Sequence, residues 1–299
     1  MTVDYYYNVG GFIFSVSLPQ GVDAGSLLPS FKPFCCEAVQ PEQCLFRITA
    51  QEHPQVPSVL GGDLLDESVN DLGYTSLFAV SDGYRVEIRH TSRAAIHHLQ
   101  ADSRFTSAVA TVFWEDCHAG SVLCSMIRIV YSQAVLLHGA ISIHASVVSH
   151  SGYAYLFMGK SGTGKSTHAA LWMKYIPDTE LLNDDNPVVR IQDGTAWVYG
   201  TPWSGKTPCY KNQGFPVGGM VRLRQAAATA FLLRQDVEAF VLLLPGCSAI
   251  RQDKILYGAL CSTLVQLAEK VPVALLYCRP DQEAATLCFT MLANKKIDD

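Results

Sequence analysis

One short segment, residues 159–167, has the residue types and spacing of a phosphate-binding loop. Its letters GKSGTGKS match the pattern G-x-x-x-x-G-K-[ST] without a mismatch. The glycines permit backbone angles and close approaches that a Cβ would block, so successive amide groups can surround phosphate oxygens. Lys165 supplies a mobile positive charge, and the Ser166 hydroxyl is a suitable ligand for Mg²⁺. The residues expected to hold a nucleotide are Gly159, Lys160, Ser161, Gly162, Thr163, Gly164, Lys165, Ser166 and Thr167.

Two adjacent acids, Asp184 and Asp185, end a short apolar run that follows the loop. A strand that ends in carboxylates can present an acid to the metal beside a phosphate loop. One acid would hold Mg²⁺, and the other would accept a proton from an attacking hydroxyl. The segment NDDNP is also good turn chemistry, and alone it indicates a turn as readily as a site. Beside the loop, we expect both acids to be catalytic and to bind metal together with Ser166.

The segments on either side of the loop have the patterns that such a loop needs. Residues 140–148, which include His144, and residues 153–158 form apolar strand patterns, and residues 167–175 have a helical pattern that ends before Pro177. Further along, helix and strand patterns alternate up to a strand at 271–277 and a helix from about Asp281. This alternation predicts an α/β fold whose sheet is covered on both faces.

The first third of the chain is predicted to be β-rich. Alternating patterns favour strands at 5–18, with a break at Gly10-Gly11, and at 44–50, 75–80, 84–90 and 107–114. Residues 121–135 then carry apolar side chains at helical spacing. We therefore place a domain boundary near residue 118, between a β-rich domain (1–118) and a nucleotide-binding domain (119–299).

Composition narrows the class of protein. The 299 residues allow two domains, and 49% hydrophobic against 16% charged residues favours a folded core. The net charge of −5 argues against a nucleic-acid-binding surface. Ten cysteines without a C-x-x-C pair predict buried thiols in a reducing compartment. Because the N-terminus has no basic leader and no apolar run approaches ~20 residues, we expect a cytoplasmic protein with no membrane segment.

Together these motifs resemble the HPr kinase/phosphorylase family, whose bacterial members phosphorylate a serine of the carrier protein HPr and can reverse the reaction. That family has a histidine fifteen positions before the first loop glycine and a doubled aspartate after the loop, as do His144, Gly159 and Asp184-Asp185 here. HPr kinase-related proteins of many bacterial genomes are similar at SGTGKSTHAALW, LLNDDNPVVR, YGTPWSGK and VPVALLYCRPDQEA, over roughly residues 136–290. The ATP-dependent phosphoenolpyruvate carboxykinases share this core more distantly.

The resemblance implies a P-loop kinase core of the HPr kinase/phosphoenolpyruvate carboxykinase type, with ATP and Mg²⁺ as cofactors. It also implies that His144 and Lys206 are catalytic. His144 would orient an acid or contact the transferred phosphate, and Lys206 would add a second positive charge at the γ-phosphate. Arg222 and Arg224 alternate on a strand, where a guanidinium can bind phosphate or form a surface salt bridge.

The leading interpretation is an ATP-dependent kinase that transfers the γ-phosphate to a serine-like hydroxyl of a protein, a peptide or a small molecule. The alternative is a nucleotide-binding regulatory or peptide-modification accessory protein with little catalysis, and a weaker one is a phosphoenolpyruvate carboxykinase-like enzyme. The identity of the acceptor, the reverse reaction and the preference for ATP or GTP stay open. So do the role of residues 1–118 and the oligomeric state, with a homo-oligomer suggested by the family's hexamers.

Overall fold

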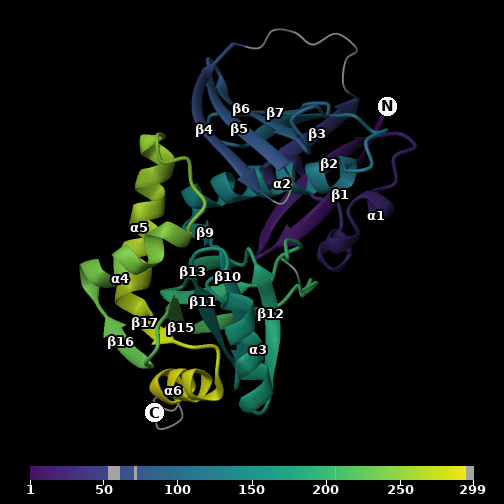
Figure 1. Ribbon diagram of the computed structural model, residues 1–299. Helices are drawn as coiled ribbons and strands as arrows, with labels where there is room; N and C mark the ends of the chain where they lie inside the picture. Colours follow the sequence, from purple (N-terminus) through teal and green to yellow (C-terminus); the bar gives the residue numbers. More distant parts are fainter. Residues whose placement is uncertain (53–60, 71–72, 206, 294–299) are drawn as a thin grey trace. The chain divides into compact units, whose positions relative to one another are not determined.

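The chain folds into two compact units. The computed structural model describes residues 1–52, 61–70, 73–205 and 207–293. Unit 1 spans Met1–Val135 and unit 2 spans Leu136–Asp299 (Figure 1). Each unit combines helices with a large sheet, so the chain is a mixed α/β protein.

Unit 1 is built on a sheet that, in the described residues, has eight strands in the order β1-β2-β3-β8-β7-β6-β5-β4. The pairs β2–β3 and β3–β8 are parallel, and the other neighbours are antiparallel. The expected break at Gly10-Gly11 is the turn between β1 and β2, where both glycines have positive φ. The strands are β1 (Thr2–Val9), β2 (Phe12–Pro19), β3 (Arg47–Glu52), β4 (Asp63–Asn70), β5 (Gly73–Val80), β6 (Gly83–Arg89), β7 (His97–Asp102) and β8 (Ser107–Val112).

Helix α2 (Ala119–Ala134) belongs to unit 1, where it packs against β7, β8 and the short helix α1 (Ala24–Leu27). The ring of Tyr131 contacts Phe12 and Phe14 edge-on, and its hydroxyl donates a 3.0 Å hydrogen bond to the carbonyl of Val9. The division between the units therefore falls after Val135 rather than near residue 118. The helical pattern was predicted, but the sheet against which the helix packs was not.

Helix α2 is also relevant to the expectation that the chain has no membrane segment. Among the described residues, one helical stretch, Ala119–His138, is long and apolar enough to cross a membrane by length and composition. Its apolar window has a mean hydropathy of 1.5 and is 67% buried inside the structure. A buried core helix has the same character, so this stretch is weak evidence for a membrane span.

Unit 2 contains a mixed sheet that has nine strands in the described residues. Its main path runs β12-β10-β11-β15-β14-β13-β9, and β17 continues from β15 to β16. Among the described strand pairs of this sheet, only β11–β15 and β15–β17 are parallel. Five strands follow one another between residues 179 and 234 with no helix in the described part, so the expected alternation is wrong there. The strands are β9 (Ala140–Ser142), β10 (Ala145–His150), β11 (Tyr153–Met158), β12 (Thr179–Asp185), β13 (Val188–Gln192), β14 (Thr195–Tyr199), β15 (Gly214–Gln225), β16 (Ala230–Arg234) and β17 (Val273–Cys278).

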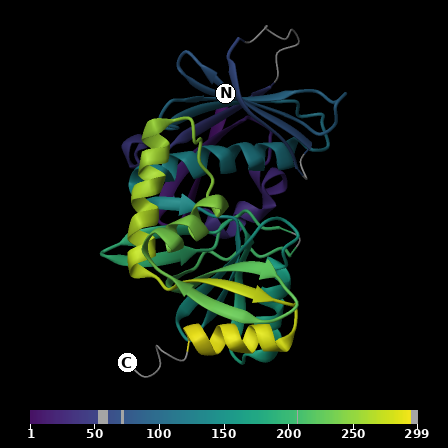
Figure 2. The same cartoon turned by 60° about the vertical axis from the view of Figure 1, so that its left-hand side comes forward.

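Helices lie on both sides of the parallel part of this sheet. Helices α3 (Lys165–Tyr175) and α6 (Gln282–Leu292) pack against each other, and their buried residues share one core with β11, β15 and β17. Trp172 is at the centre of that core, 5.0 Å from Tyr155 and 5.7 Å from Phe289 between ring centroids. Figure 2 shows α6 on one side of β16 and β17 and α4 (Asp236–Leu243) on the other; α5 (Lys254–Lys270) follows α4.

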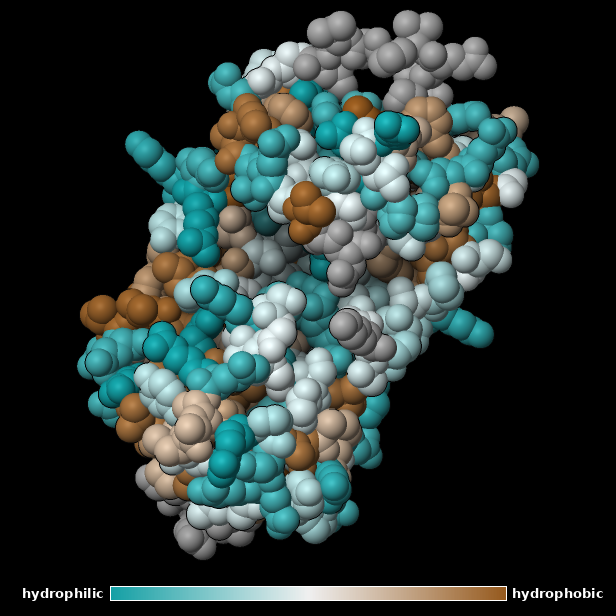
Figure 3. Space-filling model, viewed as in Figure 1, coloured by the Kyte–Doolittle hydropathy of each residue, from teal (hydrophilic) through white to brown (hydrophobic). Residues whose placement is uncertain are grey.

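Helix α4 and strand β16 expose apolar side chains that the core of unit 2 does not use. Val237 and Val241 of α4 are 73% and 57% exposed, and Leu233 of β16 is 43% exposed. Figure 3 shows hydrophobic residues over α4, on the left-hand side of the view. Apolar surface of this kind marks contact sites in many proteins.

The hydrogen bond from Tyr131 tests the assignment of α2 to unit 1. Removing the hydroxyl in Tyr131→Phe leaves the buried carbonyl of Val9 without this donor, so we expect the free energy of unfolding to fall by about 1 kcal/mol. Urea denaturation measures the change. Tyr6→Phe, on the half-buried Tyr6 of β1, is the control and should unfold like the wild type. Equal stability of the wild type and Tyr131→Phe would contradict the assignment.

A second prediction concerns His168, which is 3% exposed and accepts a 3.2 Å hydrogen bond from the Trp172 indole. Burial lowers the pKa of His168 to about 4, below its ordinary value of 6.5. Between these values the unfolded chain binds more protons than the folded one, so the free energy of unfolding falls as the pH drops from 6.5 to 4. His168 alone changes the free energy of unfolding by up to about 1 kcal/mol per pH unit in this range.

The variant His168→Gln keeps an acceptor for the indole but does not titrate. We expect its stability to depend less on pH than that of the wild type between pH 6.5 and 4. Urea denaturation at pH 7 and pH 4.5 measures both proteins, and parallel losses of stability would refute the buried neutral histidine.

Candidate functional site

The predicted phosphate loop connects β11 to α3. Between Met158 and Lys165 the backbone turns at Gly162 and Gly164, which have positive φ of 77° and 107°. A Cβ at either glycine would meet no atom within 4 Å, so backbone conformation rather than space favours glycine there. Gly164 is the N-cap of α3 and offers no capping side chain. The amides of the first helical turn are therefore available to an anion, at the positive end of the helix dipole.

Lys165 lies over the loop that precedes it. Its ammonium donates to the carbonyl oxygens of Gly159 at 3.2 Å and Lys160 at 3.4 Å. Burial lowers the pKa of Lys165, while the charges of Asp185 and Asp184 act in the opposite direction. The side chain is thus between the loop and the two acids, where its charge can act on phosphate oxygens.

The loop backbone is further fixed by contacts that the sequence analysis did not identify. The amide of Thr163 donates to the carbonyl of Lys160 at 3.1 Å, which closes a tight turn. The side-chain amide of Gln225, at the end of β15, lies 3.4 Å from the Gly162 carbonyl. The side chains of Lys160, Ser161, Ser166 and Thr167 are exposed, so the outer surface of the loop can be reached by a ligand.

The sheet brings the loop and the two acids to the same edge. Strand β10 lies between β11 and β12 and is antiparallel to both, so β11 and β12 run in the same direction. The predicted phosphate loop leaves the carboxyl end of β11, and Asp184 and Asp185 form the carboxyl end of β12. Because β10 alone separates β11 from β12, the carboxyl ends of these two strands lie close together. The loop and the acids are therefore neighbours.

A hydrogen bond joins the loop to the first acid. The Ser166 hydroxyl donates to Oδ1 of Asp184 at 2.8 Å, between the first turn of α3 and the end of β12. Asp184 is 3% exposed, and its other oxygen, Oδ2, is buried without a hydrogen-bond partner among the described residues. A buried carboxylate oxygen without a partner is unfavourable. A hydroxyl and a carboxylate are ligands that Mg²⁺ prefers, so Ser166 and Asp184 fit a magnesium ion.

The second acid lies beside His144. Nε2 of His144 is 3.3 Å from Oδ1 of Asp185, and the two side chains are 43% and 27% exposed. The strand expected at 140–148 is interrupted at His144, because its amide donates to the carbonyl of Gly246 (2.7 Å) instead of to a neighbouring strand. Asp185 also accepts from the side chain of Asn186, and its φ of 157° is unusual for a residue with a Cβ. Unlike Asp184, Asp185 is partly exposed.

Hydrogen bonds hold the segment that follows β14 against the strand end that carries the two acids. The side-chain amide of the fully buried Asn183 donates to Oγ1 of Thr201 and to the carbonyl of Trp203, both at 3.2 Å. The Ser204 hydroxyl and the amide of Gly205 donate to the carbonyl of Asp184. Lys206, expected to be catalytic, lies outside the described residues. Asn183 and Thr201 were not predicted, although their letters stand in LLNDDNPVVR and YGTPWSGK.

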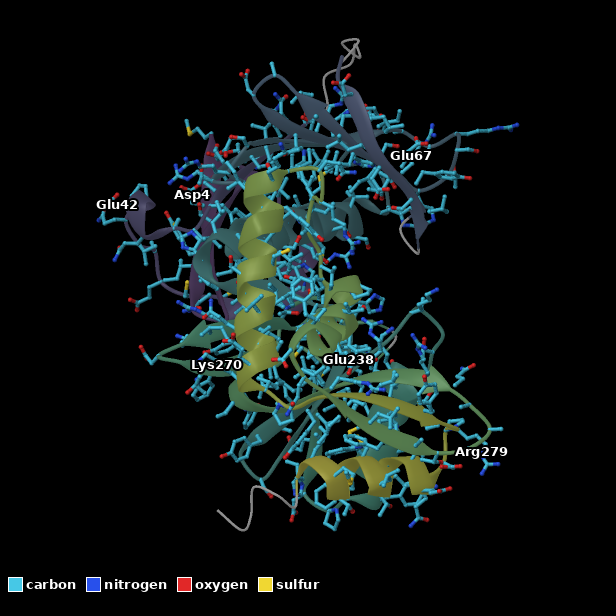
Figure 4. The ribbon with its side chains drawn as sticks, turned by 90° about the vertical axis from the view of Figure 1, so that its left-hand side faces the viewer. Asp4, Glu42, Glu67, Glu238, Lys270 and Arg279 are labelled. Atoms are coloured by element: carbon cyan, nitrogen blue, oxygen red, sulfur yellow. The ribbon has the colours of Figure 1, made fainter. Side chains whose placement is uncertain are left out.

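The structure therefore gathers Lys165, Ser166, Asp184, Asp185 and His144 around the loop. Other side chains near the predicted motifs lie elsewhere. The imidazole of His168, two residues after Ser166, is buried in the core of unit 2. Arg279 pairs with Asp281, the N-cap of α6, at 3.5 Å on the exposed edge where β17 ends (Figure 4).

Similarity to known proteins is found among solved structures. No protein-family model matches the chain, and no curated protein does. Among solved structures, the chain is similar to the Hpr(Ser) kinase/phosphatase from Coxiella burnetii, with 13% sequence identity. The match covers 52% of this chain and 91% of the other, with a TM-score of 0.34.

Proposed function

We propose that the protein is an ATP-dependent kinase that transfers the γ-phosphate to a serine-like hydroxyl of a protein, a peptide or a small molecule. The observation that carries the proposal is the joining of a phosphate loop to a buried acid through the Ser166–Asp184 hydrogen bond. The accessible acid Asp185 follows Asp184 directly, beside His144. Phosphoryl transfer depends on positioning and charge, and this arrangement supplies both.

Residues of unit 2 divide the binding task. The loop amides at 160–166, apart from that of Thr163, would hold the β-phosphate. Lys165 would leave the carbonyls of Gly159 and Lys160 to bind phosphate oxygens. Ser166 and Asp184 would hold Mg²⁺, with the unpartnered Oδ2 of Asp184 as a ligand atom. When bound, Mg²⁺ neutralises negative charge that develops on the phosphates.

Asp185 is the residue that we assign to the acceptor. Its carboxylate is partly exposed and lies 3.3 Å from Nε2 of His144. An approaching hydroxyl could donate its proton to this carboxylate. His144 would orient the carboxylate, because its own amide is fixed to Gly246. A buried Asp184 for the metal and an accessible Asp185 for the proton give the two acids separate tasks.

Nucleotide binding is tested with Lys165→Ala. Loss of a charged contact to phosphate should weaken the affinity for ADP in the presence of Mg²⁺ by about 10- to 100-fold. Isothermal titration calorimetry measures the affinity. Lys174→Ala is the matched control, since Lys174 is exposed in the last turn of the same helix and should bind like the wild type. Equal affinity of the wild type and Lys165→Ala would reject the nucleotide site.

Catalysis is tested with Asp185→Asn. We expect transfer of labelled phosphate from ATP to acceptors in a cell extract or a metabolite mixture to fall by about 10²- to 10⁴-fold, with nucleotide affinity kept. Asp193→Asn, at an exposed turn between β13 and β14, is the control.

The same assay separates the kinase from the other interpretations. A wild type that binds nucleotide but labels no acceptor above the Lys165→Ala background would favour a nucleotide-binding regulatory or accessory protein. Formation of phosphoenolpyruvate from oxaloacetate and ATP would favour the carboxykinase-like enzyme. Labelling by Asp185→Asn at the wild-type rate would remove Asp185 from the reaction.

A further inference from the structure

The strand register places Arg222 in one row with Asp185. Met158 is opposite Arg222 in the parallel pair β11–β15, and Ala145 is opposite both Met158 and Asp185. Residues in register on neighbouring strands point to the same face of a sheet. The row Asp185–Ala145–Met158–Arg222 thus has an acid at one end, a guanidinium at the other, and two uncharged side chains between them.

This row is on the face of the sheet away from α3. Phe157 and Val221, one residue earlier on each strand, are buried in the core around Trp172 that α3 and α6 cover. Because side chains alternate along a strand, Met158 and Arg222 point to the other face. Nε of Arg222 accordingly donates to the carbonyl of Leu242, near the C-terminus of α4. One side of the guanidinium is therefore occupied by α4.

The other side of the Arg222 guanidinium has no hydrogen-bond partner among the described residues. The group concerned is Nη2, which is buried. The acid of α4 that Figure 4 labels, Glu238, pairs with Arg234 at 3.5 Å. A buried charged N–H group without an acceptor is unfavourable, because it has lost water and gained nothing in return. An oxygen acceptor from a ligand would satisfy it.

Two further observations connect Arg222 to the candidate site. A Cβ built on Gly246 would stand 3.8 Å from Nη2, and the carbonyl of Gly246 accepts from the amide of His144. The guanidinium therefore lies beside the segment that fixes His144, which in turn contacts Asp185.

We propose that Arg222 forms a subsite for a phosphate group, next to the loop and on the face of the sheet away from α3. The guanidinium offers a planar donor group suited to phosphate oxygens. The phosphate would come from the γ-position of the nucleotide or from an acceptor that itself carries a phosphate. The assignment of these two sources rests on the proposed function, whereas the subsite itself does not.

Binding of inorganic phosphate tests the subsite. With Mg²⁺ and ADP at saturation the loop is occupied. Any binding of added phosphate then occurs outside the loop, at the proposed subsite. We expect Arg222→Gln to weaken phosphate binding by about 10-fold or more, as measured by calorimetry. Arg224→Gln, which removes the same charge from an exposed position two residues later, should bind phosphate like the wild type. Unchanged phosphate affinity in a folded Arg222→Gln protein overturns the proposal.

A second variant covers the case in which Arg222→Gln does not fold. Arg222→Lys keeps the positive charge beside α4 but loses the planar donor group, and we expect a smaller loss of phosphate affinity. Urea denaturation of both variants measures stability separately, because a purely structural arginine would change stability without changing phosphate affinity. Wild-type phosphate affinity in Arg222→Lys, when Arg222→Gln is unfolded, also overturns the subsite.

Two nucleotides distinguish the sources of the phosphate. If Arg222 binds the γ-phosphate, Arg222→Gln loses affinity for β,γ-imido-ATP and keeps its affinity for ADP. If it binds an acceptor's phosphate, both nucleotides bind normally, and only inorganic phosphate added to the β,γ-imido-ATP complex is weakened. Should Lys165→Ala leave ADP binding intact, the proposed nucleotide site fails, while phosphate binding without nucleotide still reports on Arg222.

Discussion

The candidate site depends on the hydrogen bond between Ser166 and Asp184. It connects a helix that begins after β11 to the end of a strand that is not a direct neighbour of β11. Ser166 and Asp184 come close together because β10 is antiparallel to both strands and aligns their carboxyl ends. The sheet edge holds both partners on rigid elements, which position side chains more precisely than loops do.

Burial separates the tasks of two acids that are adjacent in the sequence. Asp184 points toward α3, is almost fully buried and retains one oxygen without a partner. Asp185 is more exposed and contacts His144, whose position is in turn fixed by the loop at Gly246. Alternation along β12 thus gives two adjacent acids different environments, which is why we propose Asp184 as the metal ligand and Asp185 as the base. Arg222 extends this arrangement, because the register that orients Asp185 orients the guanidinium too.

Local signals were enough to predict the loop, the strand before it and the helix after it. The loop needs particular residues at each position, and Tyr153–Met158 has the bounds expected from its apolar pattern. The acids were also predicted, but their separate environments were not, because burial is set by α3 and by residues 201–205. From the sequence alone, Arg222 and Arg224 were equally good candidates for binding phosphate. Only the packing of α4 and the loop at Gly246 distinguishes it from the exposed Arg224.

Long-range packing explains where the sequence analysis was wrong. Helix α2 was assigned to the second domain, but it packs on β7 and β8 of unit 1, and its Tyr131 bonds to Val9, 122 positions earlier in the chain. His144 was expected inside a strand, and the Gly246 carbonyl interrupts that strand. Strands β4 and β7 were missed, since DLLDESVN and HHLQAD are too polar to show a clear alternation.

Hydrogen exchange measured with and without Mg²⁺ and ADP tests the central claim most directly. If the loop amides hold the nucleotide and Asp184 holds its metal, exchange in residues 160–168 slows when both are added. The slowing is then smaller with ADP and a chelator, and in Asp184→Asn. Unchanged exchange in residues 160–168, with slowing confined to the strands of unit 1, would contradict the account.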